Sequence, residues 1–107
     1  PNLGFTPNGI SFYAKVDPTS TTSNWLFMLP TSDTACSSGN NANYGFSFTP
    51  TTSWSEYGNT TAFTAYTQAF AAGSDGPLNL NNAYGCQWQN TSGDSSYGLY
   101  VDDIYFY

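Results

Sequence analysis

Short segments in which apolar and polar residues alternate constrain the fold of this chain more than any other feature. From Ile10 to Val16 every even-numbered position is apolar, and Asp17 and Pro18 close the segment. A period of two places alternate side chains on opposite faces of a β-strand, whereas an amphipathic helix needs a period of roughly 3.6. Other segments of strand type are bounded by turn residues, and they cover residues 24–29, 44–49, 54–57, 84–89 and 97–107. We therefore expect residues 1–107 to form one all-β domain, an antiparallel β-sandwich or jelly roll.

One segment has helical spacing instead. Phe63, Tyr66 and Phe70 recur at intervals of three and four residues, which predicts a turn or two of helix within residues 62–72. Nearby threonines favour helix only weakly.

The charge of the chain excludes two classes of partner. Lys15 is the only basic residue among 107, there is no Arg or His, and the formal net charge is −6. Nucleic acids and anionic membrane surfaces are bound through basic patches, so we expect neither as a partner. No apolar run approaches the roughly 20 residues of a membrane helix. The chain begins at Pro1 without a methionine or signal peptide, so we expect a processed form or part of a longer precursor.

The residues that most enzymes use for proton transfer are missing. Without His there is no usual general base, and a serine nucleophile has no partner that would activate it. A carboxylate pair such as Glu56 with Asp102 is the remaining catalytic possibility, because glycoside hydrolysis needs two carboxyl groups. We expect a protein that is not an enzyme and that requires no cofactor.

Two adjacent carboxylates, Asp102 and Asp103, stand inside the apolar closing segment. An unpaired buried carboxylate is costly, so a solvated sheet face or bulge, a hydrogen-bonded loop or a bound cation must accommodate them. Calcium is the cation that their hard oxygen ligands favour, although no EF-hand spacing is present.

Several features indicate a location outside the cell. Cys36 and Cys86 favour a single disulfide, which would close a loop of about 50 residues, with two buried free thiols as the alternative. Asn59 and Asn90 each begin an N-glycosylation acceptor pattern.

The phase of the strands predicts a ligand-binding face. If the alternating apolar residues point inward, a set of polar and aromatic residues shares the opposite face, namely Tyr13, Lys15, Gln87, Gln89, Tyr100 and Asp102. Aromatic rings that pack on sugars, together with amide and hydroxyl groups that bond their hydroxyls, are typical of polysaccharide binding. A solvated or subunit-covered sheet is the structural alternative.

Four segments resemble a known family when they are taken in order. They are residues 9–15 (GISFYAK), 54–57 (WSEY), 84–89 (YGCQWQ) and 97–106 (YGLYVDDIYF). They are similar to the C-terminal two-thirds of galactose-binding-like jelly-roll carbohydrate-binding modules of the family-11-like kind. The resemblance implies non-catalytic binding of β-glucans or related polysaccharides on a concave sheet, often beside a structural calcium. It places Tyr13, Lys15, Gln87, Gln89 and Tyr100 on that sheet.

The chain also departs from the family. Gly98 stands where the closing motif usually has Asp, and Cys86 stands at an aliphatic core position, which fits a disulfide to Cys36. Family members have further strands before the one at Ile10. Without them the sandwich is expected to be incomplete, with unpaired edges that a partner strand would complete. The alternative function is therefore a structural subunit of an extracellular filament or surface coat, assembled from copies by strand complementation and glycosylated.

Overall fold

The computed structural model describes residues 3–20, 24–30, 43–69, 78–83, 85–91 and 98–107. Their strands are β1 (Ile10–Val16), β2 (Trp25–Pro30), β3 (Asn43–Phe48), β4 (Ser55–Tyr57), β5 (Thr67–Ala69), β6 (Gln87–Asn90) and β7 (Leu99–Phe106). Two single-turn 3₁₀ helices, η1 (Phe63–Ala65) and η2 (Leu80–Asn82), complete the described elements. None of the helices in these residues is long and apolar enough to cross a membrane.

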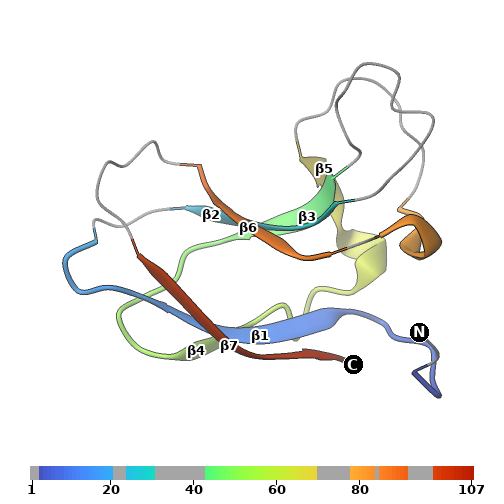
Figure 1. The fold of residues 1–107 in the computed structure, drawn as a ribbon, viewed down its shortest axis with the longest axis horizontal. Helices are drawn as coiled ribbons and strands as arrows, with labels where there is room; N and C mark the ends of the chain where they lie inside the picture. The colour runs from blue at the N-terminus through green and yellow to red at the C-terminus, as the bar shows by residue number, and fades with distance from the viewer. Residues whose placement is uncertain (1–2, 21–23, 31–42, 70–77, 84, 92–97) are drawn as a thin grey trace.

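The strands form two antiparallel sheets that lie in separate layers (Figure 1). One sheet has the order β4-β1-β7, and the other has the order β5-β3-β2-β6. All strand pairs among the described residues are antiparallel. The predicted all-β sandwich is thereby confirmed.

Within residues 62–69 the predicted helix is reduced to one turn, and Phe70 lies outside the described residues. Phe63–Ala65 forms η1, and the chain then extends at once into β5, which pairs with β3. Tyr66 is buried in the core, so its spacing from Phe63 reflects packing around a bend and not a continuous helix. Pairing with β3 supplies the backbone hydrogen bonds that a helix would have supplied.

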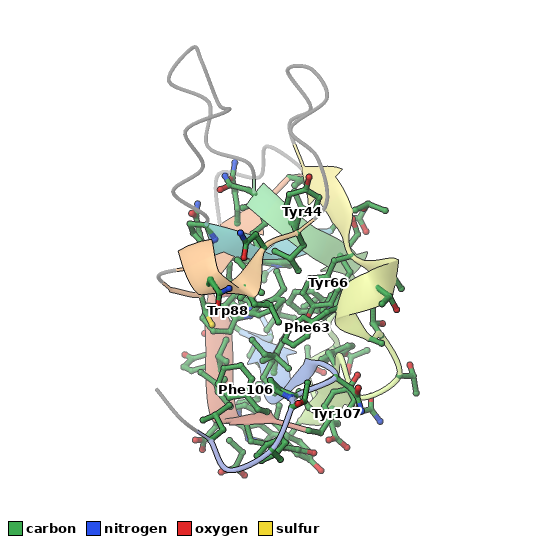
Figure 2. All side chains as sticks on the ribbon, turned by 90° about the vertical axis from the view of Figure 1, so that its right-hand side faces the viewer. Tyr44, Phe63, Tyr66, Trp88, Phe106 and Tyr107 are labelled. Carbon is green, nitrogen blue, oxygen red and sulfur yellow. The ribbon has the colours of Figure 1, made fainter. Side chains whose placement is uncertain are left out.

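An aromatic cluster holds the two layers together. Phe12 of β1 is fully buried, and its ring centroid lies 5.0 Å from Phe27, 5.2 Å from Phe48 and 5.4 Å from Trp88, all on the opposite sheet. Figure 2 shows Trp88 and Tyr66 at the level between the layers. Aromatic pairs at such separations contribute about 0.5–1.5 kcal/mol each beyond the burial of their area, so Phe12 is the centre of the core.

A β-bulge explains the two adjacent carboxylates. The β1–β7 register shifts between Ser11 and Tyr13, where Asp103 adopts a positive φ of 50°. A left-handed residue at a bulge is usually Gly, and Asp is among the few others that tolerate it. The backbone N–H of Asp103 donates to Asp102 Oδ1 at 2.8 Å, and both residues are exposed. Of the three explanations for the pair, the solvated bulge is the one observed.

The bulge also moves the end of β7 by one position in phase. Val101 pairs with Ala14 and Phe106 pairs with Ile10, so both point to the inner side of their sheet. Val101 packs against the core, whereas Phe106 stays 44% exposed. The sandwich is therefore well packed around Phe12 and open toward the end of β7.

Candidate functional site

The candidate functional site is the outer face of the three-stranded sheet, where polar and aromatic side chains from three strands lie together. Because the even-numbered residues of β1 are buried in the core, Ser11, Tyr13 and Lys15 point to the other side. Tyr13 pairs with Glu56 of β4 on one flank and with Asp102 of β7 on the other. We call this surface the outer face, and it comprises Ser11, Tyr13, Lys15, Asp17, Trp54, Glu56, Tyr100, Asp102 and Tyr105.

Lys15 lies between two aromatic rings at one end of the outer face. Its Nζ is 5.0 Å from the ring centroid of Trp54 and 5.5 Å from that of Tyr100. Both distances fall within the range of cation–π attraction. Trp54 is 46% exposed and Tyr100 is 49% exposed, so both rings keep surface for a ligand.

Tyr100 is held by its hydroxyl as well as by its ring. The hydroxyl donates to Asp17 Oδ2 at 3.4 Å, while Asp17 Oδ1 accepts from the backbone N–H of Thr19 at 2.8 Å and from its hydroxyl at 2.7 Å. The hydrogen bonds from Thr19 are the main reason that the pKa of Asp17 lies below its ordinary value, with smaller contributions from Tyr100 and Lys15. Asp17 is thus a charged anchor that orients Tyr100.

A second cluster occupies the opposite end of the outer face. Glu56 Oε1 accepts a hydrogen bond from Ser11 Oγ at 2.6 Å and another from the Tyr105 hydroxyl. Both hydrogen bonds lower the pKa of Glu56, and the bond from Ser11 has the larger effect. The bond between Tyr105 and Glu56 also raises the pKa of Tyr105. Since Ser11 is fully buried and the three residues come from three strands, the cluster ties β4 and β7 to β1.

The predicted ligand residues do not all share one face. Tyr13, Lys15 and Tyr100 come together on the outer face, but Gln87 and Gln89 belong to β6 in the other sheet. There they flank Trp88, which packs against the core, so they point to the outside of the four-stranded sheet. The prediction of a single face was wrong because period-2 phasing orients side chains within a strand and leaves open which sheet the strand joins.

Five residues of the outer face were not singled out as ligand contacts from the sequence, and one of them is the buried Ser11. Asp17, Trp54 and Tyr105 were absent from the predicted set, and Glu56 entered only as a catalytic carboxylate. The signal for Trp54 was its position two residues before Glu56 in a strand-like segment. Its use became visible only through the pairing of β4 with β1.

The predicted calcium site gains no support from the arrangement of its two ligands. Oδ1 of Asp102 already accepts from the backbone of Asp103, and calcium takes six to eight oxygen ligands. Across the residues that the structure describes, no group of three or more His, Cys, Asp or Glu side chains lies close together. Asp102 and Asp103 act here as bulge residues.

The covalent predictions are only partly covered by the described residues. Cys86 is an exposed residue that forms no disulfide within the described part of the chain, and partial burial of its thiol raises the pKa of this group. Its predicted partner, Cys36, lies outside the described residues, so the disulfide stays a prediction. Asn59 is exposed in a turn closed by the bond from Thr61 N to Gly58 O, whereas the side-chain nitrogen of Asn90 is buried. Of the two predicted glycosylation positions, Asn59 has the accessible geometry.

Comparison with known proteins adds no identification. No protein-family model, no curated protein and no solved structure matches the chain.

Proposed function

We propose that the protein is a non-catalytic, extracellular polysaccharide-binding domain whose ligand lies along the outer face. The observation that carries the proposal is the pair of half-exposed rings, Trp54 and Tyr100, held on either side of the Lys15 ammonium group. Rings that are fixed before a ligand arrives lose little conformational freedom on binding, and this favours affinity. The apolar face of a sugar packs on such rings, and its hydroxyls need polar groups at the rim.

Polar groups of both kinds surround the rings. Lys15 is a donor, and the carboxylates of Asp17 and Asp102 are acceptors that can receive hydrogen bonds from sugar hydroxyls. From Lys15 to Ser11 β1 spans four residue steps, which is about 13 Å at strand spacing, and the exposed Tyr105 lies beside the buried Ser11 at the far end. A chain of sugars, longer than a single ring, is the ligand that fits such a surface.

The charge state of the carboxylates favours binding over catalysis. The lowered pKa of Glu56 keeps this group ionised at neutral pH, whereas a general acid in glycoside hydrolysis needs a raised one. Glu56 is also committed to Ser11 and Tyr105. The proposal therefore assigns Glu56 to the support of the outer face.

Binding to soluble polysaccharides tests the proposal. In affinity electrophoresis through gels containing β-glucan, xylan or mannan, we expect retardation by at least one glycan. Trp54→Ala and Tyr100→Ala should each weaken binding about tenfold, as expected for an aromatic hot spot. Two controls are matched to the structure: Gln87→Ala with Gln89→Ala lies on the other sheet, and Phe5→Ala removes an aromatic ring that is 53% exposed elsewhere.

Both controls should bind as the wild type does. Retention by none of the glycans would refute the proposal. Equal losses in the Gln87→Ala, Gln89→Ala control would show that the ligand lies on the four-stranded sheet instead.

A further inference from the structure

An apolar cleft of about 570 Å³ opens between the two sheets, away from the outer face. Its apolar walls come from both layers and from the segment before β1, and they include Leu3, Phe5, Ile10, Leu29, Leu80 and Phe106. Among the described residues that line it, none is charged. Four of these apolar side chains are between 38% and 53% exposed. Exposed apolar surface gathered in one concave place indicates a site of interaction.

Two strand edges lie next to the cleft, because Phe106 belongs to β7 and Cys86 directly precedes β6. Within the described part of the chain, β7 pairs only with β1 and β6 pairs only with β2. In Figure 1 both strands lie toward the viewer, and in Figure 2 Trp88 and Phe106 lie on this same side. A strand edge offers backbone N–H and C=O groups, which an extended peptide satisfies by adding a strand. The cleft and the edge of β7 together fit an extended polypeptide with apolar side chains at alternate positions.

The charges on β7 argue against a second copy as that strand. If the eight residues Leu99–Phe106 paired antiparallel with the same strand of another copy, Asp102 of one would face Asp103 of the other. Like charges placed directly opposite destabilise a strand pair, and each chain carries a net charge of −6.

The same two carboxylates suit a strand that carries cations. Opposite charges across a strand pair stabilise it, and both Asp102 and Asp103 are exposed. Asp102 points to the outer face while Phe106 points to the cleft side. An added strand would therefore need cationic residues on one face and apolar residues on the other, which are alternate positions along it. We propose that β7 and the apolar cleft bind a β-strand supplied from outside residues 1–107, with apolar residues on its inner face and Lys or Arg on its outer face.

Synthetic peptides test this proposal with the 107-residue chain at physiological ionic strength. The probe has about the length of β7, with valine at alternate positions and lysine and threonine between them. One control replaces lysine by glutamate, and the other has the composition of the probe with its valines in one block. We expect the alternating lysine peptide to bind about tenfold tighter than either control by calorimetry.

Variants locate the binding. Phe106→Asp should abolish binding of the lysine peptide, whereas the matched change Ile104→Asp, at a 51% exposed residue of β7 that does not line the cleft, should not. Asp102→Asn with Asp103→Asn keeps the shape and should lower the preference for lysine over glutamate about fivefold. If circular dichroism shows that Phe106→Asp does not fold, Leu80→Asp on the opposite wall replaces it.

Three results would overturn the proposal. Equal affinity for the alternating and blocked peptides would mean that charge or hydrophobicity alone attracts them, without strand pairing. If none of the peptides bound, β7 and the cleft would not be a binding site for an added strand. A dimer in solution that Phe106→Asp dissociates and Ile104→Asp leaves intact would assign the cleft to a second copy.

Discussion

Removing the ammonium group of Lys15 while keeping its stem tests how the outer face is held. Lys15→Met deletes two cation–π contacts, to rings 5.0 and 5.5 Å away. At exposed sites such contacts contribute about 0.5–1 kcal/mol each, and both rings are nearly half exposed. Methionine retains most of the packing of the lysine stem. We therefore expect the free energy of unfolding to fall by about 1 kcal/mol, which corresponds to roughly 5 °C in Tm for a domain of this size.

A double-mutant cycle separates the contacts from general damage. Urea unfolding is followed by circular dichroism for Lys15→Met, Trp54→Leu and the double variant, and then for the same cycle with Tyr100→Leu. Each cycle should give a coupling energy of about 0.5 kcal/mol or more. The control cycle pairs Lys15→Met with Leu80→Ala, which lies on the cleft, and should give none. Coupling below about 0.2 kcal/mol in both aromatic cycles would mean that Lys15 does not organise these rings.

Three further predictions follow from other contacts. Because hydrogen bonds from Ser11 and Tyr105 hold the pKa of Glu56 below its ordinary value of 4.5, the Glu56 carboxylate stabilises the fold above that pH, and this contribution is lost as the pH falls through the lowered pKa. The difference in unfolding free energy between wild type and Glu56→Gln should thus be constant near neutral pH and shrink in acid; a constant difference at all pH values would contradict the assignment. Phe12→Ala should lower the free energy of unfolding in urea by about 4 kcal/mol, because the ring is fully buried and its removal leaves a cavity. A loss under about 1.5 kcal/mol would mean that the core is loosely packed around this position. Gly58→Ala should cost about 2 kcal/mol, since φ is 85° there and a Cβ would meet a carbonyl oxygen of β1; an unchanged Tm would disprove the strain.

The positions of the long strands could be predicted from the sequence because burial on one face imposes the alternation. Residues 10–16 were expected as a strand and form β1, and residues 24–29 and 44–49 differ from β2 and β3 by one residue at each end. The alternation failed for β5, since three residues are too few to show a period and Tyr66 beside them has helical spacing from Phe63. Local pattern determines where a strand lies when the strand is long enough to show it.

The pairing of strands could not be predicted, because a local pattern carries no information about which strands are neighbours. Period-2 phasing oriented Tyr13, Lys15 and Tyr100 correctly, but it could not tell that β6 and β7 join different sheets. Trp54 was missed because its role depends on β4 pairing with β1, some forty residues away in sequence. Five of the nine residues of the outer face reach it through such long-range pairing, which single-sequence periodicity does not contain.

The place of β1 in its sheet has a consequence for how the chain folds. This strand lies at the centre of its sheet, yet its partners are β4 and β7, and Ile10 is paired with Phe106 near the far end of the chain. Closing so long a loop costs entropy before any contact repays it, so folding is expected to be slow compared with that of proteins built from local contacts. During synthesis on the ribosome, β1 lacks its β7 partner until Leu99–Phe106 has emerged, whereas the rings that cover Phe12 (Phe27, Phe48 and Trp88) emerge earlier. A chaperone that binds β1 at that stage would protect an unpaired strand edge that is covered in the folded protein.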